Sequence, residues 1–356
     1  QVFPEREADM LAVAALLVDA GANVSDVYEA PEMPQAGTQT PLYGAIAFAN
    51  NLVLGQWLLD HGANPTDGEA LYHACELGHV EGIRMLCKAG ANPNGTNALN
   101  RALDFDNPEM VKLLLDVGAD PNDGNSGWTS LHHAALRMSS PEVCQLLIDA
   151  GADPASIGKG VSAYAAARVY GNVGLAEMMT PVPLSAEEEL LAQAVTGDVP
   201  DGVFIDPNKV PPLYLELVRE FAGAPEKLDH IKALIKLGMP WDRGDGMGVP
   251  PLQIAGWMGQ PEMLRYFLDL KPDLGHRNMH GGGILGTILH GAQNNPERAG
   301  RDYVGCLQMV LEEGVALPES AISGATKSRA RNSLRSTNTK MGVPGPTNSP
   351  ISAAVS

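Results

Sequence analysis

Apolar residues recur along the chain in pairs of short segments. Each first segment opens on a leucine that is followed three positions later by a small residue, as in Leu42/Ala45, Leu71/Ala74, Leu99/Ala102, Leu131/Ala134 and Leu252/Ala255. Residues three apart share one face of a helix, and an alanine there lets a neighbouring helix approach closely. Each second segment carries two adjacent apolar residues, as in Leu58-Leu59, Met85-Leu86, Leu113-Leu114 and Leu146-Leu147. The pattern predicts an all-α chain of paired short helices.

Polar turns separate the predicted helix pairs at regular places. A glycine ends each second helix, because glycine takes the left-handed conformation of a helix end at low cost. Asn-Pro or Asp-Pro then blocks any continuation of the helix. These endings are Gly62-Ala63-Asn64-Pro65, Gly90-Ala91-Asn92-Pro93, Gly118-Ala119-Asp120-Pro121 and Gly151-Ala152-Asp153-Pro154. A unit of this size cannot bury its apolar face alone, so the units must stack on one another.

Repeated openings complete the unit: Thr40-Pro41-Leu42-Tyr43, Thr129-Ser130-Leu131-His132 and Pro250-Pro251-Leu252-Gln253. With these openings and endings, the stretch from about residue 5 to 317 resembles the ankyrin repeat, a turn and two antiparallel helices in about 33 residues. The resemblance implies an ankyrin-repeat solenoid of stacked helix-turn-helix units, with about eight repeats, some of them degenerate. Passages such as Ile288-Leu289-His290-Gly291 also resemble proteobacterial ankyrin-repeat proteins of unassigned function.

Three regions of the chain differ in the regularity of the pattern. Residues 1–180 hold regular repeats, and residues 181–320 hold divergent repeats with insertions. In the second region, Ser185-Ala186-Glu187-Glu188 is a capping-box pattern that opens a helix. Residues 321–356 form a Ser/Thr-rich basic tail, which we expect to be disordered because it cannot bury enough apolar surface to fold.

The distance from each glycine to the next opening leucine predicts the length of the projecting turn, which forms a hairpin finger in ankyrin repeats. The distances are nine residues for Gly62–Leu71 and Gly90–Leu99, thirteen for Gly118–Leu131 and twenty-one for Gly21–Leu42. We therefore expect two shortened fingers, near 64–70 and 92–98, and a first finger lengthened by residues 28–39.

The net charge limits the classes of partner that the chain can bind. The chain has 42 acidic and 24 basic side chains, a net charge of -18, whereas nucleic-acid binding needs a basic face. No stretch reaches transmembrane length and no signal peptide is visible. The four cysteines show no CxxC spacing, which favours buried thiols in a reducing compartment. We therefore expect a cytoplasmic monomer with no nucleic-acid or membrane partner.

Candidate catalytic and metal-binding motifs are weak. His280-Gly281-Gly282-Gly283 copies the oxyanion loop of lipases, but the Gly-x-Ser-x-Gly nucleophile elbow of that chemistry does not occur. A turn is the expected structure there. The resemblance implies that His79 and His132 bond to a neighbouring turn, and no Cys/His/Asp cluster has zinc spacing. We expect no metal, no cofactor and no enzyme activity.

The resemblance also identifies a candidate binding face. In ankyrin repeats the residues at the end of the first helix face a concave groove and are usually polar. Here they are largely apolar, with Trp128 at a fingertip, and the candidate partner-binding residues are Phe48, Leu77, Phe105, Trp128, Leu136, Tyr170, Trp257 and Met258. An apolar row on an exposed surface is typical of a protein-binding site. The alternative is that each side chain packs against the adjacent helix.

Acidic residues flank this row, at Glu76, Asp104 and Asp106, which favours a partner protein with an apolar ridge and a basic rim. The sequence therefore predicts a non-catalytic protein–protein interaction module, an adaptor or an inhibitor. Two alternatives stay open. The first is a regulatory ankyrin region of a larger enzyme whose catalytic domain is missing from this chain, and the second is a secreted, host-directed effector.

Overall fold

The computed structural model describes residues 6–29, 38–124 and 127–316. It is helical apart from two short hairpins, as the pattern predicted. The chain forms two compact units, which are described separately: unit 1 is Gln1–Phe221 with Glu226–Pro240, and unit 2 is Ala222–Pro225 with Trp241–Ser356. The predicted tail lies outside the described residues. Among the helices of the described ranges, none combines the length and the apolar character that a membrane crossing requires.

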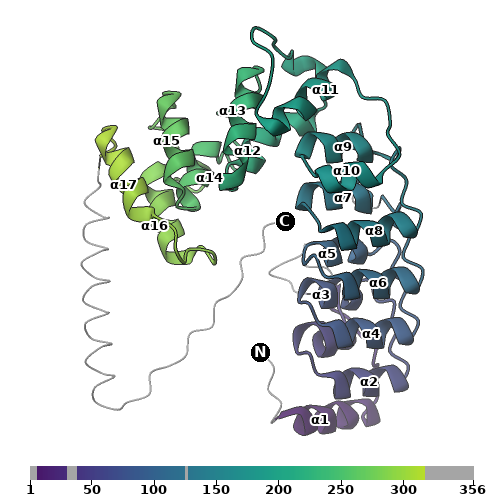
Figure 1. The fold of residues 1–356 in the computed structure, drawn as a ribbon. Coiled ribbons are helices and arrows are strands. Elements are labelled where there is room, and N and C mark those ends of the chain that lie inside the picture. The colour runs from purple at the N-terminus through teal and green to yellow at the C-terminus, as the bar shows by residue number, and fades with distance from the viewer. Residues whose placement is uncertain (1–5, 30–37, 125–126, 317–356) are drawn as a thin grey trace, which may run out of the picture. The chain divides into compact units, whose positions relative to one another are not determined.

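Unit 1 begins with a stack of helix pairs. The elements are α1 (Glu7–Asp19), η3 (Tyr43–Phe48), α2 (Leu52–Asp60), α3 (Ala70–Glu76), α4 (Val80–Lys88), α5 (Ala98–Leu103), α6 (Pro108–Asp116), α7 (Ser130–Arg137), α8 (Pro141–Asp149), α9 (Ala163–Tyr170) and α10 (Val173–Met178). The first helices of the pairs pack on one another in chain order, and so do the second helices. Figure 1 shows α3, α5, α7 and α9 in one layer and α2, α4, α6 and α8 in the other.

The residues that carried the sequence pattern form the core of this stack. The opening leucines Leu42, Leu71 and Leu131 are buried, and so are the alanines that follow them. Polar side chains begin the second helices: the Asn51, Asn107, Ser140 and Asn172 side chains each accept a hydrogen bond from an N–H of the first turn. Such caps satisfy backbone donors that have no partner inside the helix. The paired helices therefore follow directly from the sequence.

The turns between the pairs differ in length, as predicted. β1 (Tyr28–Glu29) pairs antiparallel with β2 (Thr38–Gln39), which confirms the long first finger. β3 (Ile157–Gly158) pairs antiparallel with β4 (Val161–Ser162). The turns that follow Gly62 and Gly90 contain no strand, which confirms that these two fingers are short.

Asparagine side chains join successive turns of unit 1. The Asn94 amide donates to Gly118 O at 3.0 Å and accepts from Asp120 N at 2.8 Å. The Asn122 amide repeats this one unit later, with Gly151 O at 2.9 Å and Asp153 N at 2.7 Å. Each amide thus satisfies two backbone groups of the next turn, and the finger edge is tied together by hydrogen bonds.

The rest of unit 1 is less regular. It contains α11 (Ala186–Gln193), η4 (Ala194–Thr196), η5 (Pro207–Lys209), η6 (Pro212–Glu216), α12 (Leu217–Phe221), η7 (Pro225–Lys227, at the junction of the units) and α13 (Leu228–Lys236). The predicted capping box is confirmed: Ser185 Oγ accepts from Glu188 N, and the Glu188 carboxylate accepts from Ser185 N. Unit 1 therefore continues well past residue 180, where the regular pattern ends, and the predicted domain limits stay a prediction.

Unit 2 contains two further helix pairs. They are α14 (Pro251–Trp257) with α15 (Pro261–Asp269), and α16 (Ile284–Asn294) with α17 (Tyr303–Glu312). Leu252, Ala255 and Ile288 are buried between them. Gly256 permits a close approach, because a Cβ atom there would lie 2.8 Å from a carbon of Ile288. The motif His280–Gly283 forms a turn, as predicted, in which Asn278 N donates to Gly282 O at 3.0 Å.

Candidate protein-binding surface

Three large apolar side chains are exposed at the ends of successive first helices in unit 1. Phe48 is 64% exposed, Leu77 is 49% exposed and Phe105 is 47% exposed. We call Phe48, Leu77 and Phe105 the apolar row. Each comes from a neighbouring unit of the stack, since η3 packs on α3 and α3 packs on α5. Isolated exposed apolar residues are common on proteins, but a set repeated from unit to unit is characteristic of an interaction surface.

Tyr170 does not extend this row, and the expectation that it faces an open groove is wrong. Its side chain is only 2% exposed. The ring lies edge-on to Phe221, with centroids 5.7 Å apart, and the hydroxyl donates to Glu220 at 2.8 Å. Both partners belong to α12. The sequence pattern of the divergent region gave no sign that α12 covers the end of α9.

Trp128 was expected at an exposed fingertip, and this expectation is also wrong. The side chain is 7% exposed. Lys159 Nζ lies 4.6 Å from the ring centroid on one side, and the His132 ring lies 5.1 Å away. Lys159 is in the turn of the β3–β4 hairpin, so the finger of the next unit packs across the tryptophan.

The other three candidates are half-buried. Leu136 lies on α7 of unit 1, and Trp257 and Met258 lie at the end of α14 in unit 2. The Trp257 ring packs against His290 at 5.0 Å, and Met258 Sδ lies 3.4 Å from Asn295 Nδ2. These side chains thus divide their surface between contacts inside their own unit and solvent. A binding role for any of the eight candidates stays a proposal.

A set of paired charges crosses the first helices beside the apolar row, and we call it the charged network: Glu69, His73, Glu76, Arg101, Asp104, His133 and Arg137. On α3, His73 Nδ1 lies 2.6 Å from a Glu76 oxygen. Glu76 also pairs with Arg101 of α5. The other arm of Arg101 donates to Asp104 at 2.6 Å. The network therefore joins neighbouring units through side chains that are about three-quarters buried.

Asp104 is the most connected member of the network. One carboxylate oxygen lies 2.8 Å from His133 Nε2 and 2.7 Å from Arg137 Nε, both on α7. Burial alone would raise the pKa of Asp104, but the His133 hydrogen bond and the Arg137 charge outweigh it and hold the pKa at about 2. Asp104 is therefore held ionised, with its charge paired to the Arg101, His133 and Arg137 side chains.

Sequence reasoning named Glu76 and Asp104 only as flanking acids and missed the network. A signal was available in the repeat register. His73, Arg101 and His133 each follow an opening leucine by two residues, while Glu76 and Asp104 follow one by five. Positions two and five lie on one helical face because they are three apart, so the units of α3 and α5 each place a basic and an acidic side chain side by side.

His79 and His132, which the resemblance predicted to bond to a neighbouring unit, do so in the structure. His79 Nδ1 lies 3.2 Å from Ile46 O in the preceding unit, and His132 Nε2 lies 3.1 Å from Val161 O in the following one. Burial lowers the pKa of His132, which favours the neutral ring that such bonds use. In the described ranges no three His, Cys, Asp or Glu side chains gather as metal ligands would.

Comparison with known proteins agrees with the helix pairs. A sequence model described as ankyrin repeats in three copies matches residues 7–97 and 88–157. An ankyrin repeat domain from Acinetobacter baumannii AYE is a similar solved structure, at 22% identity and a TM-score of 0.40, over 48% of this chain and 92% of that one. No curated protein matches the chain.

Ankyrin repeats are protein-interaction modules and are typically non-catalytic. The likeness to proteobacterial proteins in particular stays a prediction, and so does the number of repeats. The helix pairs of residues 7–157, with their glycine ends and cross-unit histidine bonds, account for the match to the sequence model. Residues 7–157 of the chain therefore carry ankyrin repeats.

Proposed function

We propose that the chain is a non-catalytic adaptor or inhibitor that binds one partner protein along the apolar row of unit 1. The observation that carries this proposal is the exposure of Phe48, Leu77 and Phe105 at the ends of three neighbouring first helices. Aromatic side chains in such a position can bury a large area at a small entropic penalty, which is why they dominate binding energy at interfaces.

The charged network supports the proposal in a second way. Its side chains are already paired within the surface, so less conformational freedom is lost when a partner covers them. The carboxylates of Glu76 and Asp104 are held ionised next to Leu77 and Phe105. A partner with an apolar ridge and a basic rim would complement both features.

Site-specific photo-crosslinking tests this placement. A photoreactive phenylalanine analogue replaces Leu77 or Phe105 in the full chain, and crosslinked proteins from the source cells are identified by mass spectrometry. Val117, which is 40% exposed at the end of α6, is the matched control because it lies on the second-helix layer. We expect the same protein to be crosslinked at Leu77 and at Phe105, and not at Val117. Equal capture at all three positions would contradict the proposed surface.

The two alternatives from the sequence, a regulatory region of a larger enzyme and an exported effector, have no specific support in the described residues. The full coding sequence around this chain tests the first. A catalytic domain in the same reading frame would favour it over an independent adaptor.

A further inference from the structure

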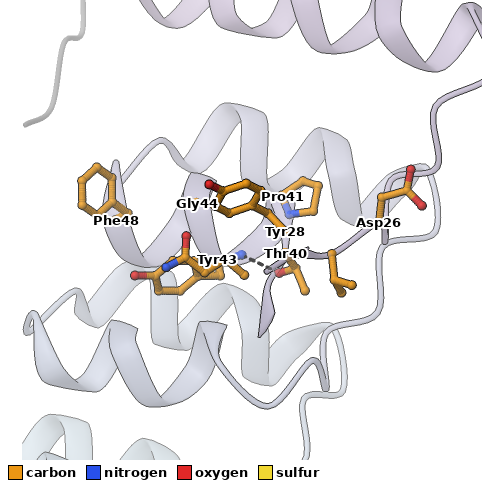
Figure 2. Close-up of a pocket in the computed structure, with 9 residues that line it drawn as sticks. Asp26, Tyr28, Thr40, Pro41, Tyr43, Gly44 and Phe48 are labelled. Atoms are coloured by element: carbon orange, nitrogen blue, oxygen red, sulfur yellow. Dashed lines mark hydrogen bonds between the residues drawn. The ribbon is translucent and has the colours of Figure 1, made fainter. Parts of the chain in front are cut away.

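A hollow of about 460 Å³ opens beside Phe48, between the first finger and η3. Three aromatic residues line it, Tyr28, Tyr43 and Phe48, together with Pro41 and Asp26. Figure 2 shows Phe48 at one end and Asp26 at the other, with Tyr28 and Tyr43 between them. Tyr28 and Phe48 are each more than half exposed, so both rings are available to a partner.

An extra residue in the helix creates this arrangement. In the other clear units, the left-handed residue that ends the first helix comes seven positions after the opening apolar residue, as in Leu71 to Gly78 and Leu99 to Asp106. From Leu42 to Asn50 the distance is eight. The chain absorbs the insertion by widening η3 into a π-helix, in which Ala49 N donates to Gly44 O five residues back.

The widening places Tyr43 and Phe48 on the same side of the helix. Five residues of an α-helix rotate a side chain about 140° away from its starting direction. A π-helix, whose hydrogen bonds span five residues, turns less per residue, so residues five apart point in more similar directions than they do in an α-helix. The two rings therefore line one hollow because of the insertion. Single π-turns of this kind are frequent at functional sites.

The surroundings of the hollow are acidic. From Glu7 to Ile83 the sequence has eleven Asp and Glu residues and no Lys or Arg. Asp26 is at the rim, and its carboxylate is exposed. Burial raises the pKa of Tyr43, and the nearby carboxylates of Glu69 and Glu76 raise it further. The faces of aromatic rings are also partially negative, so the rings and the carboxylates both favour a positively charged ligand.

We propose that the hollow receives a protonated lysine or arginine side chain of the partner protein. A cation within about 6 Å of a ring centroid is attracted to the face of the ring, and three rings with a carboxylate at the rim provide this attraction from several sides. A neutral apolar side chain would pack against the rings but would gain nothing from the nearby carboxylates. This inference rests on the proposed function, because Phe48 belongs both to the hollow and to the apolar row.

Binding of defined peptides to the full chain tests the inference. The probe is a fluorescent dodecapeptide of glycine, serine and leucine with one central lysine, and it is compared with the same peptide carrying arginine, norleucine or glutamate. Norleucine retains the methylenes of lysine and lacks its charge. At low ionic strength we expect the lysine and arginine peptides to bind roughly tenfold more tightly than the norleucine peptide. Equal affinity for lysine and norleucine would overturn the inference.

Variants of the chain locate the effect. Tyr28→Leu combined with Phe48→Leu keeps apolar bulk and removes two ring faces, and we expect the preference for lysine over norleucine to fall to about twofold or less. Asp26→Asn should reduce the preference by a smaller factor. Phe105→Leu is the matched control, since it removes a ring of the apolar row outside the hollow, and it should leave the preference unchanged. Because both replaced rings are exposed, circular dichroism should show an unchanged fold.

The chain's own basic tail is the competing occupant. Full-length protein with Lys327, Arg329 and Arg331 replaced by glutamine should bind the lysine peptide as the wild type does. A tenfold gain in affinity would show that the tail fills the hollow, and would overturn the assignment to a partner. Failure here is distinguishable from failure of the proposed function, because crosslinking at Leu77 and Phe105 does not depend on the hollow.

Discussion

Phe105 and Tyr170 occupy the same place in their repeats, six residues after the residue that opens the first helix, yet one is 47% exposed and the other 2%. The difference comes from the element that packs next to each unit. Beside Phe105 the next first helix, α7, contributes His133 and Arg137 to the charged network. Beside Tyr170 the chain leaves the regular repeat, and α12 packs over the ring. Exposure at an equivalent repeat position is thus set by the next element of the stack.

Alanine variants of Tyr170 and Phe105 should differ most in the free energy of unfolding. Tyr170→Ala removes a buried ring and should lower the free energy of unfolding by about 3–5 kcal/mol. Urea titration followed by circular dichroism measures this. Tyr170→Phe, which removes only the bond to Glu220 and keeps the ring, is the control and should have a much smaller effect. A loss below about 1 kcal/mol for Tyr170→Ala would mean that α12 does not cover it.

Acid should weaken the elements that cover Tyr170. His230 on α13 is buried against the Phe221 ring, at 4.8 Å, and neither ring nitrogen has a hydrogen-bond partner among the described residues. Burial, with a smaller effect of the Lys227 charge, lowers the pKa of His230 to about 3 from the ordinary 6.5.

As the pH falls, His230 takes up a proton in the unfolded state at a higher pH than in the folded state. The free energy of unfolding therefore has its full value above pH 6.5 and decreases as the pH drops toward 3. The loss should be about 1.4 kcal/mol per pH unit at most. Urea titrations between pH 7 and pH 4 test this, with His230→Phe as the comparison. The variant should show a shallower fall over that range, and an unchanged slope would exclude His230 as the cause.

The charged network beside Phe105 should respond to a different change. Asp104→Asn removes the charge that His133, Arg101 and Arg137 share, and should cost about 1–3 kcal/mol of stability. The folded pKa of Asp104 is about 2, below its ordinary 3.8. Its contribution is therefore present above pH 4 and lost only between about pH 4 and pH 2. Glu109→Gln, at an exposed pair with Arg84 on the second helices, is the control and should have little effect.

The smallest stability effect is expected at Phe105 itself. Phe105→Ala should change the free energy of unfolding by about 0.5 kcal/mol or less, because the ring already contacts water. The same variant should weaken binding of the crosslinked partner by about 1–3 kcal/mol. Stability is measured by urea titration and affinity by calorimetry. A core-sized loss of stability with unchanged affinity would assign Phe105 to packing.

Local sequence was enough to predict the helix pairs and the two kinds of finger. Leu71, Leu131 and their alanine partners are buried as their spacing requires, and the long first finger forms its hairpin. These features depend on residues within a single repeat, where helix period and turn chemistry act directly. The structural roles of His79 and His132 followed from the resemblance.

The features that were not predicted depend on contacts between units or on a change of register. Trp128 and Tyr170 are covered by a hairpin and by α12, and a single repeat holds no information about either. The π-helix depends on one additional residue between Leu42 and Asn50, which only a comparison with the other units shows. Phe48 itself follows Leu42 by six residues, as Phe105 follows Leu99, so the additional residue lies between Phe48 and the left-handed Asn50.

The asparagine links along the finger edge fix the separation between neighbouring units. Asn94 and Asn122 each hold two backbone groups of the following turn, so adjacent turns cannot spread apart without breaking two hydrogen bonds per unit. We therefore expect the stack to be stiffer along this edge than along the second helices, whose buried contacts, such as Leu86 and Leu114, are apolar and non-directional. These links hold the units of α5, α7 and α9 at a set distance, and of the apolar row only Phe105 lies in this part of the stack. If a partner covers this part of the stack, we therefore expect it to match the existing spacing of the units, because their turns cannot move apart to fit it.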